Sequence, residues 1–230
     1  MTEYSLRRSP RARRVRVSVD GDGAVRVTLP RRAPLREADE AVRELAPWIE
    51  RRRRALARAA AEVARTPGTV PYLGRELRLV PQPGRTRVHR RRDVLLVPAD
   101  EVAARRNGGR LATADEVGAA IERWYRRAAR AEIAPRLDAA TFRAGVAYTT
   151  LTIRGQKTRW ASCSQNGAMS FNWRLLLAPE AVLDYVVEHE VCHLEVMDHS
   201  PRFWRLLERR VPDWREHAGW LRRYGSTLVL

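Results

Sequence analysis

Cysteine is scarce in this chain of 230 residues, which contains only Cys163 and Cys192. Two cysteines are too few for the disulfide framework of a small secreted domain. Long apolar runs are missing as well: no stretch approaches the roughly 18 residues that a membrane-spanning helix needs, and none follows the basic N-terminus to form a secretory signal. We therefore expect a cytoplasmic protein that does not associate with membranes.

Lysine is almost absent too, because Lys157 is the single lysine among 44 basic residues, and the formal net charge is +17. A positive charge of this size is typical of proteins that bind a nucleic acid or another polyanion. The arginines occur in every segment of the chain, and alanine is abundant, which a coding bias also produces. The charge is therefore compatible with a nucleic-acid partner but does not require one.

The hydrophobic pattern changes along the chain. Residues 12–30 alternate apolar and polar side chains on both sides of an Asp-Gly-Asp-Gly turn, as a β-hairpin does. Residues 36–64 follow a helical pattern, in which Pro47 predicts a kink or a restart. We assign residues 1–105 to a β-rich N-terminal region and residues 113–230 to a second domain. The expected fold class is α+β.

Histidine is rare, with five in the chain, yet three of them lie in the segment EHEVCHLEVMDHS, residues 188–200. A helical projection of this segment and the residues before it gives one narrow charged stripe on a mostly apolar surface. The stripe consists of Asp184, Glu188 and Glu195. We therefore expect a largely buried helix whose charged stripe faces outward.

His189, Glu190 and His193 project roughly 120 to 160° away from this charged stripe, toward the interior. A buried carboxylate without a partner costs several kcal/mol, and a bound cation removes that cost. Histidines four residues apart on a helix present two imidazoles to one metal ion, and the glutamate between them reaches a water beside the metal. The segment therefore predicts a site for one zinc ion in the H-E-x-x-H pattern.

A catalytic zinc usually has three protein ligands and one open position. His199, six residues after the second histidine, is the natural third ligand. Ser200 and Pro201 suit the first positions of another helix, which would hold this histidine in a corner between two helices. Glu208 and Glu216 are the alternative third ligands.

Asn166 and Gly167 predict a second hairpin, with these two residues as its loop. The resulting register gives an apolar face for the core, formed by Trp160, Met169, Phe171 and Trp173. The opposite, polar face carries Cys163 and Asn172. It also pairs Arg159 with Arg174, two like charges that need an anion or a carboxylate between them. Because the hairpin closely precedes the histidine helix, we expect it to border the site. The candidate substrate-side residues are Asn172, Arg159 and Arg174.

The segment TRWASCSQNGAMSFNWRLLLAPEAVLDYVVEHEVCHLEVMDHSPRFW resembles the YgjP-like zinc metallopeptidases, which are related to the SprT-like and WLM groups. The likeness includes the N-terminal valine hairpin and the short segments PWIERR, YLGRELRL and WYRRAA, so it covers nearly the whole chain. Ala161 and Val191 stand where members commonly have glycine and leucine. Neither difference changes a residue that could bind metal.

The resemblance implies a zincin-like C-terminal domain, metal ligation by His189, His193 and His199, and Glu190 as catalytic base. We interpret the chain as a zinc metalloendopeptidase-type hydrolase that acts on proteins or peptides. One alternative is a metal-dependent hydrolase of nucleotides or other phosphoesters, although no glycine-rich phosphate loop is present. The other is a nucleic-acid-associated binding module with a structural zinc, which would have no use for the glutamate.

Overall fold

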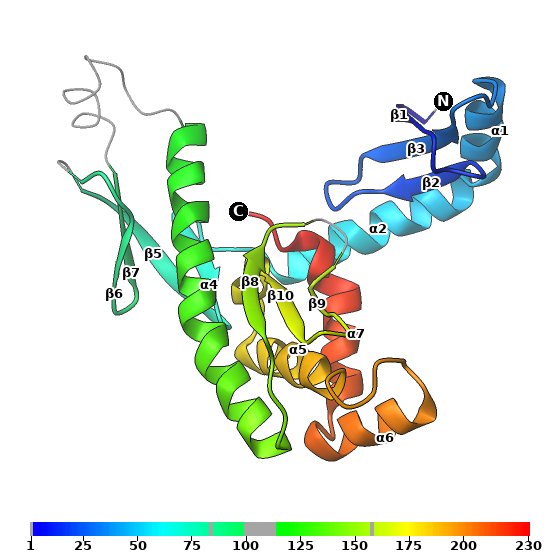
Figure 1. Ribbon diagram of the computed structural model, residues 1–230. Helices are drawn as coiled ribbons and strands as arrows, with labels where there is room; N and C mark the ends of the chain where they lie inside the picture. The colour runs from blue at the N-terminus through cyan, green and yellow to red at the C-terminus, as the bar shows by residue number, and fades with distance from the viewer. Residues whose placement is uncertain (1, 83–84, 99–113, 157–158) are drawn as a thin grey trace. The chain divides into compact units, whose positions relative to one another are not determined.

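The computed structural model describes residues 2–82, 85–98, 114–156 and 159–230 (Figure 1). Its contacts form two compact units, one of Met1–Ala64 with Arg222–Thr227 and one of Arg65–Leu221 with Leu228–Leu230. Strands and helices together confirm the α+β class. The boundary predicted between residues 105 and 113 lies outside the described residues and stays a prediction. Within the described ranges, no helix is long and apolar enough to span a bilayer.

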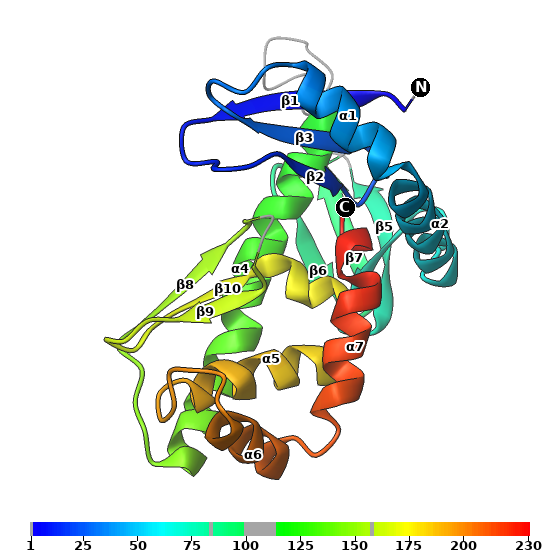
Figure 2. The ribbon, with the colours of Figure 1, turned by 90° about the vertical axis from the view of Figure 1, so that its right-hand side faces the viewer.

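The first unit contains a three-stranded sheet and two helices (Figure 2). Its strands, in the order β1-β3-β2, are β1 (Tyr4–Ser9), β3 (Val25–Pro30) and β2 (Arg16–Val19). β2 and β3 are antiparallel, with Val17 opposite Val27, whereas β1 lies parallel to β3 on its other side. The helices are α1 (Arg36–Glu44) and α2 (Ala46–Glu62). The chain restarts between them because Pro47, in the first turn of α2, lacks the N–H that a continuous helix would need there.

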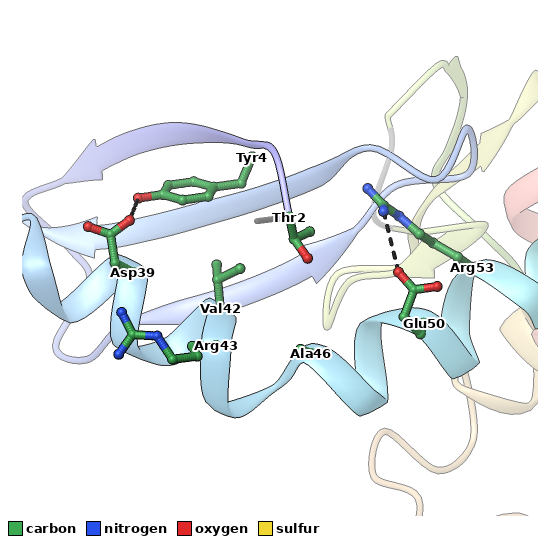
Figure 3. Close-up of a pocket in the computed structure, with 8 residues that line it drawn as sticks. All are labelled: Thr2, Tyr4, Asp39, Val42, Arg43, Ala46, Glu50 and Arg53. Carbon is green, nitrogen blue, oxygen red and sulfur yellow. Dashed lines mark hydrogen bonds and ion pairs between the residues drawn. The ribbon is translucent and has the colours of Figure 1, made fainter.

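One face of this sheet packs against the helices and forms the core of the first unit. The buried members of that core are Val25, Val27, Leu29, Ala38, Val42 and Ile49. A pocket of about 440 Å³ lies on this helical side, between the start of the chain and the two helices (Figure 3). The Tyr4 hydroxyl donates a hydrogen bond of 2.6 Å to Asp39 across the pocket. The opposite face of the sheet takes no part in this core.

The second unit begins with a four-stranded sheet in the order β4-β5-β7-β6. Its strands are β4 (Thr69–Tyr72), β5 (Arg75–Gln82), β7 (Val94–Pro98) and β6 (His89–Arg91). The long helix α4 (Ala114–Ala144) packs on it through aromatic rings, with the centroids of Tyr72 and Trp124 5.5 Å apart. The Tyr125 hydroxyl also donates to the carbonyl of Pro71. These contacts join the sheet to the helix that supports the rest of the unit.

A second sheet of this unit has the order β8-β10-β9. Its strands are β8 (Thr150–Arg154), β10 (Ala168–Asn172) and β9 (Ala161–Cys163). β8 runs parallel to β10, and β9 is antiparallel to it and forms an edge of the sheet. The short helix η1 (Trp173–Leu177) follows β10 directly and is almost entirely buried. This sheet leads the chain from α4 into the histidine helix.

The predicted register of the Asn-Gly hairpin is wrong by one residue. Met169 pairs with Cys163, and the amide of Gly167 donates to the carbonyl of Ser164, so the loop has three residues instead of two. Gly167 adopts a left-handed φ of 74°, which three-residue hairpin loops require at their last position. The shift by one moves side chains to the opposite face. Consequently, Cys163 faces the same side as Met169 instead of the polar side.

The second unit is completed by α5 (Glu180–Cys192), α6 (Pro201–Arg210) and most of α7 (Trp214–Tyr224). The last turn of α7, from Arg222, and η2 (Gly225–Thr227) belong to the first unit. α5 is largely buried, as its pattern predicts. Its charged stripe is neutralised by arginines from neighbouring helices. The ion pairs are Asp184 with Arg136 at 2.9 Å, Glu188 with Arg143 at 2.6 Å, and Glu195 with Arg210.

Candidate metal centre

Three histidines converge where α5 ends and α6 begins. His189 is in the last turn of α5, His193 caps its C-terminus, and His199 lies in the loop just before α6. One ligating atom from each of these side chains lies within 4.8 Å of the others. The Nε2 atoms of His189 and His199 are 3.1 Å apart. Two nitrogens bound to one tetrahedral zinc are separated by about 3.3 Å, so these side chains need little movement to share an ion.

His193 is oriented by the backbone of the loop that follows it. Its Nδ1 lies 3.1 Å from the carbonyl oxygen of Val196, a distance at which the ring donates a hydrogen bond. A carbonyl partner fixes the proton on Nδ1 and leaves Nε2 free as a metal ligand. The backbone of this loop therefore selects the tautomer that a metal site requires.

Two aromatic side chains at the start of α6 hold the imidazoles in place. Phe203 is fully buried, and its ring centroid lies 4.5 Å from that of His193 in a stacked arrangement. The same ring contacts His189 at 4.9 Å and His199 at 4.7 Å. Trp204 stacks on His199 at 5.4 Å, with 26° between the ring planes. The histidine cluster thus rests on an apolar, rigid base that limits ring rotation.

Burial keeps the buried imidazoles uncharged. It lowers the pKa of His189 to about 3, and the neighbouring His193 and His199 contribute to this shift. Burial also lowers the pKa of His193. Neutral imidazole is the form that binds a metal ion. These two side chains are therefore prepared for ligation at neutral pH.

Glu190 lies on the same helix, between the first two histidines, and is 6% exposed. Its Oε2 atom is buried and has no hydrogen-bond partner among the described residues. Burial raises its pKa to about 8, and a backbone hydrogen bond from Cys163 acts in the opposite direction. A cation and a water molecule beside this carboxylate would satisfy the unpaired oxygen and favour the charged form. The predicted inward orientation of Glu190 is confirmed.

The two alternative third ligands do not join the cluster. Glu208 forms an ion pair of 2.5 Å with Arg215, and Glu216 is exposed on α7. Among the described residues, the three histidines have no fourth histidine, cysteine or carboxylate in their group. Three ligands with one position left over are typical of catalytic rather than structural zinc sites. The donor set therefore fits a catalytic metal ion.

The predicted corner before α6 exists but is built differently. Ser200 occupies the N-cap position with an extended backbone, yet its side chain makes no capping hydrogen bond. Instead, the carboxylate of Asp198 accepts a 3.1 Å hydrogen bond from the backbone N–H of Ser200. This short turn fixes the position of His199 between α5 and α6.

The hairpin borders the histidine helix, since β9 contacts α5 and the Cys163 backbone reaches Glu190. The polar face predicted for it is wrong. Asn172 is 3% exposed, and its side-chain amide donates to the carbonyls of Gln156 at 2.7 Å and Arg159 at 3.3 Å. Its Oδ1 accepts a hydrogen bond from the Arg174 amide at the start of η1. This asparagine therefore holds the local backbone and does not face solvent.

The two arginines predicted to face each other lie in different elements. Arg174 belongs to η1, and its guanidinium lies 4.4 Å from the centroid of the Trp173 ring. Arg159 is exposed and precedes β9. Of the three candidate substrate-side residues, Arg159 is exposed, Arg174 is half-buried and Asn172 is buried.

Nothing in the sequence indicates a role for Phe203 or Trp204, although both belong to the segment HSPRFW. Two aromatic residues at the start of a helix suggest only a buried face. Their stacking on the histidines depends on the angle between α5 and α6, which no local pattern contains.

Converging imidazoles, a buried glutamate beside them and an open ligand position are typical of a metal-dependent hydrolase. A family model described as "YgjP-like, metallopeptidase domain" matches residues 13–224, and the chain belongs to this family. No curated protein matches the chain. The crystal structure of the metallopeptidase zymogen of Pyrococcus abyssi abylysin is 26% identical, over 37% of this chain and 87% of that chain. Its TM-score of 0.34 is too low to indicate a shared overall fold.

Proposed function

We propose that this metallopeptidase is a zinc-dependent endopeptidase whose metal is held by His189, His193 and His199, with Glu190 as the catalytic base. The observation that carries the proposal is the buried Glu190 carboxylate with an unpaired oxygen, next to three converging imidazoles. A structural histidine cluster would have no reason to retain such a costly group. An all-nitrogen donor set suits zinc better than magnesium or calcium, which prefer oxygen ligands.

Zinc bound in this way would polarise the scissile carbonyl and lower the pKa of a water ligand toward 7. Glu190 would then take the proton of the attacking water and deliver it to the leaving amine. The carboxylate accepts a hydrogen bond from the backbone of Cys163, whereas its Oε2 atom has no partner. Oε2 is therefore the atom available for this proton transfer. That hydrogen bond also fixes the carboxylate, so the base does not need to reorient.

The outer edge of β9 would hold the substrate. At the two ends of this strand, the Trp160 carbonyl accepts a hydrogen bond from the N–H of Asn172, and the Ser164 N–H donates to the carbonyl of Ala168, both in β10. Backbone groups alternate in direction along an antiparallel edge strand, so those of Ala161 and Cys163 point away from β10. The Cys163 N–H is directed to Glu190, so this edge lies beside the carboxylate that we propose as the base.

An extended peptide would add to this edge through main-chain hydrogen bonds, which demand little of its sequence. Recognition through main-chain hydrogen bonds does not require a chain terminus, and for this reason we propose internal cleavage. Arg159, exposed just before β9, would contact an acidic side chain or the phosphate of a modified peptide.

Incubation of the zinc-loaded protein with a library of unmodified peptides, followed by mass spectrometry, tests this function. We expect internal cleavage that a chelator abolishes and that added zinc restores. A parallel incubation with nucleoside triphosphates examines phosphoester hydrolysis. Release of phosphate together with intact peptides would contradict the proposal.

A further inference from the structure

The outer face of the first unit's sheet consists of arginine, serine and threonine side chains, which have no role in the proposed peptidase site. In the observed register, Arg7 of β1, Thr28 of β3 and Arg16 of β2 lie side by side, and Ser5, Arg26 and Ser18 form the next row. These side chains point away from the core, because their strand neighbours Val25, Val27 and Val17 face the helices. We call these six residues, together with the exposed loop arginines Arg11, Arg13 and Arg14, the arginine surface.

Five of the six arginines of this surface have no acidic partner among the described residues. Residues 4–19 contain six arginines and no acidic residue. Among the described residues, the side chains of Arg7, Arg16 and the three loop arginines have no ion pair or hydrogen bond, whereas Arg26 pairs with Asp20 at 2.7 Å. The arginines that face α5 in the second unit, by contrast, each pair with a carboxylate. Unpaired charges this close together repel one another, which a bound polyanion would relieve.

The spacing of the arginines and the hydroxyl side chains between them are suited to binding phosphate groups. Neighbouring strands are about 4.8 Å apart, so the α-carbons of Arg7 and Arg16 are separated by about 10 Å with a threonine between them. Small hydroxyl side chains between the arginines let a backbone approach closely and can themselves donate to phosphate oxygens. The six sheet residues include no aromatic side chain on which an unpaired base could stack, unlike surfaces that bind single strands.

We propose that the arginine surface binds the phosphate backbone of duplex nucleic acid without regard to sequence. A duplex has one charge per about 1.7 Å of its length, about twice the charge density of a single strand, and it requires no stacking. The surface also lacks large apolar side chains that would insert into a lipid layer. The inference does not depend on the proposed peptidase chemistry.

Binding of a fluorescent duplex of about 20 base pairs, measured by anisotropy from about 50 to about 200 mM salt, tests this surface. The wild type should lose affinity steeply as salt increases, because each neutralised phosphate releases counterions. In the double variant Arg7→Gln/Arg16→Gln, the dependence of log K on log salt should become shallower. The magnitude of its slope should decrease by about 2, close to 0.9 for each lost contact. The double variant Arg13→Gln/Arg14→Gln should show the same decrease in slope. Because these two arginines lie in a loop, the result does not depend on whether substitutions in the strands disturb folding.

A matched control is Arg123→Gln/Arg127→Gln on α4, which removes the same formal charge from two exposed arginines without described partners. This control should keep the wild-type slope. Equal weakening in all three variants would mean diffuse charge and would overturn the proposal. Tighter binding of a single strand, or binding of vesicles with anionic headgroups but not of duplex, would overturn it as well. Cleavage of an uncharged peptide should be unchanged in every variant, so a failure of the peptidase proposal is visible separately.

Discussion

At the scale of single residues, Glu190 combines burial, an unpaired oxygen and a position between two histidines of the candidate metal centre. In the proposed mechanism a base acts only in the chemical step, whereas the histidines would hold the metal. We therefore expect Glu190→Gln to retain zinc and fold but to lower kcat by about 10²- to 10⁴-fold. Zinc content by elemental analysis and peptide cleavage rates measure the two effects. Full activity in a variant that still binds zinc would exclude Glu190 as the base.

The pH behaviour of metal uptake offers a second prediction for the same residue. With its pKa raised to about 8, the Glu190 carboxyl of the metal-free protein carries a proton near pH 6. A cation beside it favours the ionised form, so metal uptake should expel that proton. His189 and His193 contribute none, because their lowered pKa values leave them neutral.

Titration calorimetry near pH 6, in two buffers of different ionisation enthalpy, counts the released protons. The wild type should release about one more proton than Glu190→Gln. Near pH 10 this difference should vanish, since the carboxyl is then ionised before the metal arrives. Equal proton release from both proteins near pH 6 would contradict the raised pKa.

The orientation of single residues within α5 follows from the sequence because helix phase is a local property. The spacing of His189, Glu190 and His193 and the position of the charged stripe need nothing beyond the 3.6-residue period. A loop histidine has no helical phase, so His199 is favoured by its spacing and by the helix start at Ser200 and Pro201, and the resemblance to the family implies the same ligand. The support from Phe203 and Trp204 arises from the packing of two helices and was outside the reach of any local pattern.

At the scale of elements, the Asn-Gly hairpin shows how one loop residue changes the role of a side chain. The Asn-Gly pair correctly predicts a hairpin, but both two- and three-residue loops accept glycine at their last position. Choosing between them depends on which register buries the strand better, and each face of β10 is buried here. Asn172 therefore changed from a predicted solvent-facing residue to a buried one.

Asn172→Ala should consequently destabilise the protein. The substitution leaves the Gln156 and Arg159 carbonyls and the Arg174 amide without their partner. Each unsatisfied buried polar group costs about 1–3 kcal/mol, and we expect a total loss toward the upper end of that range. Urea denaturation measures it. Gln165→Ala, at an exposed position of the hairpin loop, is the control and should change stability by less than about 0.5 kcal/mol.

The loop between α5 and α6 contains His199, the proposed third metal ligand, and two substitutions test this assignment. His199→Ala should weaken zinc binding strongly, because two imidazoles remain from a converging set of three. Glu216→Ala should bind zinc as the wild type does, since this side chain is exposed on α7 and outside the cluster. Competition with a chromogenic chelator measures both affinities. The opposite ranking of the two variants would reverse the assignment.

At the scale of the whole molecule, the described residues form two hydrophobic cores, one in each unit. The smaller core joins the β1-β3-β2 sheet to α1 and α2, and the larger joins the other two sheets to α4 and the C-terminal helices. The candidate metal centre belongs entirely to the second unit. Separate cores usually open as separate cooperative units, even in a protein where both are needed for function.

Metal removal should therefore destabilise one unit and leave the other unchanged. A ligand at a hundred times its Kd stabilises the unit that binds it by about 2.7 kcal/mol, which slows exchange through global opening of that unit by about 100-fold. Hydrogen exchange followed by mass spectrometry, with excess zinc and with chelator, compares the units directly. Amides of α4 and α5 should exchange faster without zinc, while those of β2 and β3 should keep their rates. His199→Ala provides the control, because its exchange should not respond to zinc in either unit. Equal acceleration of both units in the wild type would show that the two cores unfold together.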